Sequence, residues 1–436
     1  MRAWMARVIV FVAAVAGAAT VGAGQAAPQQ APAPAPGRSA SLPPDANGNP
    51  RRLVGRTGHV SNYDESKIPP YTLPDPLLLA NGRKVTTPSA WAGQRRPEII
   101  KLYESFIFGR VPATAPTIAW RVTDVDRRAH GGTAVVKHVL GSVGTPARGV
   151  RIHVTVTTPA SASGRVPLIL IMNFGGGADL NAAARSLPVG DPPVAADILE
   201  RGWGFATVGY QDIQPDVADS LTEGVIGLAL KSARTQPASD EWGAISAWAW
   251  GASRIIDYLQ TDPAVDGRRI ALQGFSRLGK SMLWASALDT RIVAVFAACA
   301  GEMGSALSKR DYGETVDDMA QNFPWWFSGT YQQWPGRWEQ MPVDAHMLIA
   351  LSAPRRVFLT GGTGDQWADP NGEFLAARAA TPVYQLLGKS GLPAADMPPL
   401  DTASIDGDIG WYYHTGPHAV PEADWRAFLN FLLKRF

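Results

Sequence analysis

Apolar and polar positions change their period several times along the chain, and these changes separate predicted strands from predicted helices. Residues 166–172 and 204–209 are almost continuously apolar, which is typical of strands buried on both faces of a parallel sheet. Residues 151–157 place an apolar residue at every second position, which predicts a half-buried antiparallel strand. Further strand-like runs cover residues 117–122, 134–140, 293–299 and 356–360.

Helical periodicity fills the stretches between several of these runs. Apolar residues recur with helical spacing in residues 88–108, 242–259 and 423–436. Strands that alternate with helices in this way predict an α/β fold, a three-layer αβα sandwich with a mostly parallel central sheet.

One turn between a strand and a helix carries the first chemical signal. A short apolar run ends at Gly274 and a helical pattern begins a few residues later, so that strand, tight turn and helix meet at Ser276. This is the nucleophile elbow of the α/β hydrolases, in which the turn lifts a serine hydroxyl clear of the sheet. A side chain at Gly274 would collide with the start of the helix. The usual second glycine, two residues after the serine, is Leu278 here, and Gly279 follows one place later.

Two cations follow the candidate nucleophile. Arg277 and Lys280 fall in the first helical turn, where the helix dipole disfavours positive charge by roughly 0.3–1 kcal/mol each. Their placement against that preference suggests that they hold an anion or a developing negative charge. The alternative interpretation is that both are solvated surface charges.

The order of a catalytic triad in this fold limits the partners of the serine, because the acid and then the histidine should follow it. Asp365 comes first after the glycines that end the penultimate strand, and Asp369 is interpreted as the cap of the next helix. His414 and His418 both precede the last helix. His418 is preferred because it is nearer to that helix and follows a Gly-Pro turn.

A glycine run follows the buried strand 166–172, in the sequence Asn-Phe-Gly-Gly-Gly of residues 173–177. α/β hydrolases place backbone N–H donors for the oxyanion at this point, upstream of the elbow. A plain flexible turn is the alternative.

The N-terminal residues predict an export signal and a spacer. An apolar run from Val8 to Val21, preceded by Arg2 and Arg7 and followed by small residues, predicts a signal peptide over residues 1–27 and a secreted or periplasmic protein. A retained membrane anchor is the alternative, although the run is short for a span. Residues 28–60 are rich in alanine and proline and predict a linker, which leaves residues 61–436 as the catalytic domain.

Charge and cysteine content exclude several classes of protein. The formal charge falls from +2 to 0 without residues 1–27, and no basic tract is present, so nucleic-acid binding has no support. Cys299 is the only cysteine, which rules out an intrachain disulfide. Cysteines and histidines do not follow the spacing of metal ligands, and we expect a monomer without metal or cofactor.

Tryptophan is abundant, with 15 residues. Sugar rings stack on exposed indoles, although core packing explains most tryptophans in most proteins. Six are expected on loops at the C-terminal edge of the sheet: Trp325, Trp326, Trp334, Trp338, Trp367 and Trp411.

The elbow sequence resembles that of a known family. Residues 274–280, Gly-Phe-Ser-Arg-Leu-Gly-Lys, resemble the G-[CF]-S-R-x-G-K signature of the glucuronoyl esterases, carbohydrate esterase family 15. The resemblance extends from about Trp91 to the C-terminus. Its further matches are Arg310 with Gly313-Glu314, residues 323–327, 353–356 and 365–370, and the turn at 416–418.

The resemblance implies a role for each matching position. Ser276 would be the nucleophile, His418 the general base, and Arg277 a ligand of the oxyanion. The implied sugar-binding residues are Lys280 and Glu314, which would contact uronate hydroxyls, and Trp367, which would line the sugar site.

One position departs from the family pattern. Many members carry the triad acid as a glutamate after the strand that follows the elbow helix, and Cys299 stands there in this chain. A thiol cannot hold an imidazole as a carboxylate can, so the acid role is assigned to Asp365, the alternative position in bacterial relatives. Glu302 is close in sequence and remains a second choice.

The expected reaction is therefore hydrolysis of the ester between (4-O-methyl-)glucuronic acid of glucuronoxylan and a lignin alcohol, through an acyl-enzyme. A carbohydrate acetyl esterase is one alternative, although an acetyl group would leave Lys280 nothing to bind. A non-catalytic sugar-binding homologue is another, against which the complete Ser–Asp–His order argues.

Overall fold

The computed structural model describes residues 37–145, 149–175, 192–230, 235–433 and 436. These residues belong to a single compact unit. The predicted signal peptide, and Gly176 and Gly177 of the predicted oxyanion loop, lie outside the described residues. Within the described segments, no helix is both long enough and apolar enough to cross a membrane.

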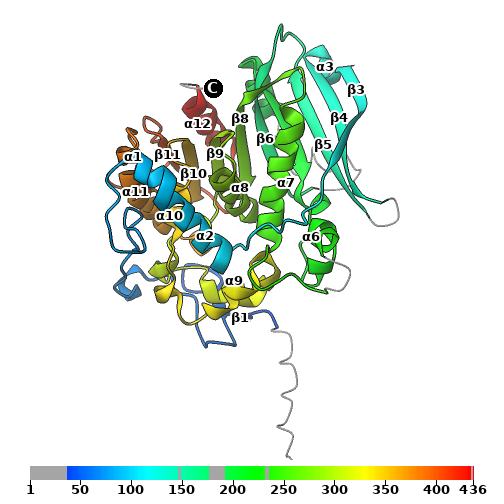
Figure 1. The fold of residues 1–436 in the computed structure, drawn as a ribbon. Coiled ribbons are helices and arrows are strands. Elements are labelled where there is room, and N and C mark those ends of the chain that lie inside the picture. The colour runs from blue at the N-terminus through cyan, green and yellow to red at the C-terminus, as the bar shows by residue number, and fades with distance from the viewer. Residues whose placement is uncertain (1–36, 146–148, 176–191, 231–234, 434–435) are drawn as a thin grey trace, which may run out of the picture. The chain divides into compact units, whose positions relative to one another are not determined.

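A nine-stranded sheet forms the centre of the fold, in the order β11-β10-β9-β8-β6-β7-β5-β4-β3 (Figure 1). Strands β6 to β11 run parallel to one another, and β5, β4 and β3 continue the sheet beyond β7 in antiparallel pairs. The strands are β3 (Ala119–Arg128), β4 (Ala134–Gly144), β5 (Gly149–Pro159), β6 (Val166–Asn173), β7 (Gly204–Gly209), β8 (Val265–Phe275), β9 (Ile292–Ala298), β10 (Arg356–Gly362) and β11 (Ile409–His414).

Helices cover both faces of the sheet, and the prediction of an αβα sandwich is confirmed. The longer helices are α2 (Arg96–Phe106), α5 (Pro192–Glu200), α7 (Ala244–Leu259), α8 (Arg277–Leu288), α11 (Pro370–Leu386) and α12 (Glu422–Leu432). The shorter helices are α1 (Pro88–Ala90), α3 (Ala129–Gly132), α6 (Gly224–Ala229), α9 (Val316–Asn322) and α10 (Ala345–Ala350).

Strand β6 shows why a central strand is apolar throughout. Its residues Leu168, Leu170 and Met172 join the core that contains α7 and α8, whereas Ile169 and Ile171 join the core that contains α5 and α12. Each such side chain stabilises the fold by about 1.5–3 kcal/mol through its burial. Both faces must therefore be apolar.

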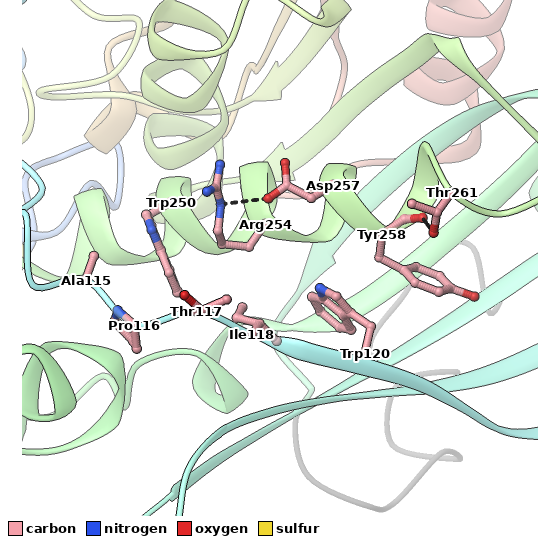
Figure 2. Close-up of a pocket in the computed structure, with 10 residues that line it drawn as sticks. All are labelled: Ala115, Pro116, Thr117, Ile118, Trp120, Trp250, Arg254, Asp257, Tyr258 and Thr261. Carbon is pink, nitrogen blue, oxygen red and sulfur yellow. Dashed lines mark hydrogen bonds and ion pairs between the residues drawn. The ribbon is translucent and has the colours of Figure 1, made fainter.

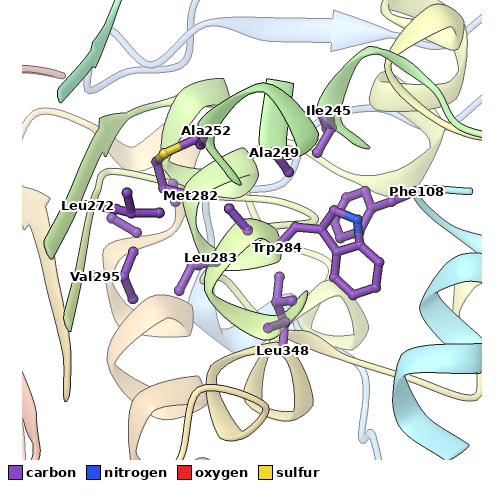
Figure 3. Close-up of a cluster of buried hydrophobic side chains, with 14 of the residues drawn as sticks. Phe108, Ile245, Ala249, Ala252, Leu272, Met282, Leu283, Trp284, Val295 and Leu348 are labelled. Atoms are coloured by element: carbon purple, nitrogen blue, oxygen red, sulfur yellow. The ribbon is translucent and has the colours of Figure 1, made fainter. Parts of the chain in front are cut away.

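The larger core fixes the elbow helix against the sheet. Figure 3 shows Met282 and Leu283 of α8 among apolar side chains of α7 and of the strands that carry Leu272 and Val295. All four of these side chains are fully buried. The start of α8, and with it the serine before the helix, is consequently held at the end of β8.

The described part of the predicted linker is packed on the domain. Strands β1 (Ala40–Leu42) and β2 (Arg51–Leu53) pair antiparallel, and Val54 keeps only 1% of its surface exposed. The Ser39 amide donates to Asn322 Oδ1 at 2.8 Å. Alanine and proline content suggested a spacer, but local composition carries no information about a distant partner.

The segment before the last helix also differs from its prediction. Residues 411–414, expected on a loop, are part of β11, which pairs parallel with β10. Trp411 is fully buried and belongs to the core. Its indole therefore packs against apolar residues and is unavailable for stacking on a sugar.

Candidate active site

The serine of the elbow has a strained backbone. Ser276 links β8 to α8 with φ 58° and ψ −127°, a conformation that costs about 1–3 kcal/mol for a residue other than glycine and that clusters at functional sites. A Cβ on Gly274 would lie 2.3 Å from the Leu278 carbonyl oxygen, and one on Gly279 would lie 2.9 Å from the Ala300 Cβ. Gly279 stands one place later than the usual second glycine, but it still allows α8 to approach the loop that contains Ala300.

A histidine and a carboxylate meet beside this serine. His418 Nδ1 lies 2.5 Å from Asp365 Oδ2, and the His418 ring packs on Phe275, 4.5 Å between centroids. Asp365 follows β10 and His418 follows β11, so parallel strands bring both to the edge where β8 ends at Ser276. The Asp365 side chain is 4% exposed and that of His418 40%, which leaves the imidazole open to a substrate.

The alternative partners lie elsewhere. His414 is buried and its Nδ1 lies 3.1 Å from Asp424 Oδ1, so it has a carboxylate of its own. Asp369 accepts the Gly372 amide at 2.9 Å and caps α11, as its position suggested. Glu302 is buried beside Ser308, and burial raises its pKa well above the usual range.

Cys299 stands next to the histidine and its carboxylate. Ligand atoms of Cys299, Asp365 and His418 lie within 4.8 Å of one another, a cluster that spacing along the sequence could not reveal. A metal would need a thiolate and a free imidazole nitrogen. Burial instead raises the pKa of the Cys299 thiol well above its usual value and disfavours the thiolate. Cys299 is therefore poorly suited to bind a metal, whereas Asp365 and His418 form a carboxylate–imidazole pair.

Arg277 is held in an aromatic slot. Its guanidinium lies over Trp326 at 4.7 Å, with Phe174 at 5.6 Å and Phe323 at 5.8 Å. Nη1 donates to Asp216 Oδ2 at 2.5 Å. These contacts exclude the interpretation of Arg277 as a freely solvated surface charge.

Lys280 and Glu314 form a second polar cluster, one helical turn from Ser276. The Lys280 ammonium is buried and donates to the Ala300 carbonyl at 2.7 Å. Burial lowers the pKa of Lys280, and the charge of Glu314 opposes that shift. The Glu314 amide donates to the Trp367 carbonyl at 2.8 Å, and the Trp367 side chain bonds the Glu314 carboxylate. Burial raises the pKa of Glu314 to about 7, against the effect of Lys280.

Sequence reasoning missed two carboxylates with buried side chains near the site, Asp216 and Glu373. Neither belongs to a motif of the elbow or the triad. Glu373, on α11, accepts the Gly301 amide at 2.8 Å and the Ser305 hydroxyl at 2.5 Å. It thus anchors the loop that begins at Cys299. Burial raises its pKa to about 8, and the nearby Asp365 adds to the shift.

The raised pKa of Glu373 predicts a change in stability with pH. The folded protein retains this proton between the ordinary pKa of 4.5 and about 8, whereas the unfolded chain releases it. The proton on Glu373 therefore contributes fully to the unfolding free energy below pH 4.5. This contribution falls as the pH rises and is lost once the pH passes the pKa of about 8 in the folded protein. Glutamine cannot lose a proton. Between pH 4.5 and about 8, the unfolding free energy of Glu373→Gln should therefore fall less steeply than that of the unaltered protein, by about 1 kcal/mol per pH unit.

Urea unfolding of both proteins across this pH range measures the effect. Glu200→Gln, the same change at an exposed position of α5, serves as the matched control and should leave the slope unchanged. Equal slopes for Glu373→Gln and the unaltered protein would contradict the prediction.

A separate hollow of about 420 Å³ lies beside α7 (Figure 2). It is lined by aromatic and polar side chains that include Trp120, Trp250, Arg254 and Tyr258. These residues come from α7 and the start of β3, whereas the serine, the acid and the histidine follow β8, β10 and β11. The hollow is not the candidate active site.

Fold and site together define the class of protein. The central sheet is mostly parallel, and a serine with a strained backbone follows one of its strands. A histidine and a buried acid follow two other strands and contact each other. This combination is typical of an α/β hydrolase.

The comparisons with known proteins give the family. A profile described as "Glucuronyl esterase, fungi" matches residues 236–388. A carbohydrate esterase from an unknown prokaryotic organism is 37% identical over 397 residues, covering 85% of this chain and 91% of the relative. A 4-O-methyl-glucuronoyl methylesterase from Cerrena unicolor is 30% identical over 76% of this chain and 64% of its own.

A solved structure supports the same assignment. The glucuronoyl esterase from Solibacter usitatus is 38% identical, superposes with a TM-score of 0.79, and covers 84% of this chain and 98% of its own. The chain belongs to the glucuronoyl esterases of carbohydrate esterase family 15 and is a carboxylic ester hydrolase.

Proposed function

We propose that this protein hydrolyses esters of glucuronic acid, with the uronic acid as the acyl group. The observation that carries the proposal is the cluster of Lys280, Glu314 and Trp367 beside the elbow. A buried ammonium and a carboxylate near Ser276 can pair with several hydroxyls of one sugar whose C6 carbonyl is under attack. An acetyl group offers no hydroxyl for them.

In the proposed reaction Ser276 attacks the ester carbonyl while His418 takes the serine proton. Asp365 keeps the imidazole oriented through Nδ1 and stabilises the imidazolium that forms. His418 then gives its proton to the leaving alcohol, and the glucuronoyl group stays on the serine. Water attacks this acyl-enzyme with His418 again as the base, which releases the acid and restores the hydroxyl.

Arg277 supplies the charge that the tetrahedral oxyanion needs. Its charge-assisted hydrogen bond should stabilise the transition state by about 2–4 kcal/mol, more than a neutral donor would. The aromatic slot keeps the guanidinium in place before the substrate arrives, so little reorganisation is required during the reaction.

The natural substrate that we propose is the ester between glucuronic acid, including its 4-O-methyl form, on glucuronoxylan and a lignin alcohol. Residues 1–27 would direct export of the enzyme as a signal peptide and would then be cleaved. The mass of the N-terminal peptide of exported protein tests that cleavage, and an intact N-terminus would contradict it.

Lys280→Ala tests the proposed function through substrate choice. We expect kcat/KM on a glucuronate benzyl ester to fall by about 10-fold to 100-fold, the value of one or two charge-assisted hydrogen bonds. The rate on phenyl acetate, which has no sugar, should stay nearly unchanged. Parallel assays of both proteins on the two esters and on acetylated xylan measure the effect.

Two outcomes would contradict the proposal. Equal losses on the glucuronate ester and on phenyl acetate would mean that Lys280 supports the elbow helix and does not recognise the sugar. A preference of the unaltered enzyme for acetylated xylan would identify a carbohydrate acetyl esterase instead.

A further inference from the structure

The carboxylate of Asp216 is a meeting point of four hydrogen-bond donors. Oδ1 accepts from the indole of Trp325 at 2.8 Å and from that of Trp326 at 2.6 Å. Oδ2 accepts from the Tyr210 hydroxyl at 3.1 Å and from Arg277 Nη1 at 2.5 Å. Since an ionised carboxylate offers about four acceptor sites, this one is saturated.

The carboxylate of Asp216 is buried and therefore needs hydrogen-bond partners. The Asp216 side chain is 3% exposed, and a buried carboxylate without partners would cost several kcal/mol. Its donors come from three parts of the chain: the turn after β7, the start of α8 and the segment after α9. The carboxylate of Asp216 consequently links these three parts of the chain through hydrogen bonds, next to the guanidinium of Arg277.

The same contacts leave part of the guanidinium unused. Arginine has five N–H groups, of which Nη1 serves Asp216. In the part of the chain that the structure describes, Nε is buried and has no hydrogen-bond partner, so the exposed surface of the Arg277 side chain, 30% of the whole, belongs to its other atoms. The ion pair with Asp216 and the stacking on Trp326 thus fix the plane of the Arg277 guanidinium. Other N–H groups of the same guanidinium remain for a substrate oxygen.

We propose that Asp216 is a positioning residue for catalysis, which acts by holding Arg277 in the orientation that binds the oxyanion. The inference rests on the esterase mechanism proposed above, and its effect should appear with any ester, because every ester forms the same oxyanion.

The position of a negative charge near a forming oxyanion needs an explanation, since like charges repel. Two indoles and a phenol disperse the charge of Asp216 over neutral donors, which weakens its effect at a distance. The guanidinium also stands in contact with the carboxylate. The net field at the oxyanion is then set by the nearer cation.

A double-mutant cycle separates positioning from general structural support. We expect Asp216→Asn to lower kcat by about 10-fold to 100-fold with KM within about twofold, because the lost bond acts in the transition state. Arg277→Ala should lower kcat by about 30-fold to 1000-fold. The double variant should be no slower than Arg277→Ala, since Asp216 would have nothing left to position.

Tyr210→Phe is the matched control, because it removes one donor from Asp216 and keeps the ion pair with Arg277. It should cost less than Asp216→Asn. Near-ultraviolet circular dichroism of the tryptophans shows whether each variant is folded. Both a glucuronate benzyl ester and phenyl acetate are assayed, so that a failure of the sugar specificity is distinguishable from a failure of the positioning role.

Guanidinium rescue covers the case in which Asp216→Asn does not fold. In Arg277→Ala, with Asp216 and Trp326 intact, added guanidinium should raise kcat saturably. Absence of rescue would overturn the proposal. So would losses that multiply in the double variant, or a kcat that rises in Asp216→Asn, which would show that its charge acts directly on the oxyanion.

Discussion

Ser276→Ala should lower kcat on a glucuronate ester by at least about 10³-fold while the protein remains folded. Without the hydroxyl no acyl-enzyme can form, and water would have to attack the ester directly. The strained backbone at Ser276 belongs to the turn between β8 and α8, so alanine should adopt the same conformation. Steady-state assays of the two purified proteins measure the loss.

A covalent probe supplies the control for this experiment. A fluorophosphonate should label the unaltered protein on the peptide that contains Ser276 and should leave the variant unlabelled. Retention of more than a few per cent of activity, in a preparation that the probe shows to be free of other serine hydrolases, would end the serine-esterase mechanism.

Asp365→Asn should lower kcat by about 10²-fold to 10⁴-fold, because the imidazole of His418 would lose the carboxylate that orients it and stabilises its charged form. The contact in question is the 2.5 Å pair between Nδ1 and Oδ2. Measurement of kcat and KM on the glucuronate ester should show the change in kcat, with KM little affected.

Two neighbours of the proposed triad provide matched comparisons. Cys299→Ser should have little effect, because the buried thiol carries no charge toward His418. Glu302→Gln should also be mild, since Glu302 lies beside Ser308. If Cys299→Ser were the damaging change, or if Glu302→Gln matched Asp365→Asn, the acid would have been assigned to the wrong residue.

The pattern of apolar positions was sufficient for the order of strands β3 to β10, whereas β11 was expected on a loop. A strand buried on both faces must be apolar throughout, as β6 is, and an elbow must combine small residues with a serine, as residues 274–279 do. These requirements are local, so the sequence alone predicted the sandwich and pointed to Ser276.

Choices between neighbouring candidates needed the tertiary structure. His414 and His418 are four residues apart in similar surroundings of the chain. They differ because Asp424, on α12, lies beside the first, whereas Asp365, after β10, bonds the second. The partner of a buried histidine depends on how helices and strands pack, which no local pattern records.

The aromatic slot that holds Arg277 could not be predicted from the sequence, for the same reason. Two cations at a helix N-terminus indicated a function, but the carboxylate that holds one of them lies 61 residues away and takes two further donors from tryptophans more than 100 residues on. Those tryptophans were expected on loops at the C-terminal edge of the sheet. Their indoles instead donate to Asp216, because burial obliges a charged group to find partners wherever the fold brings them.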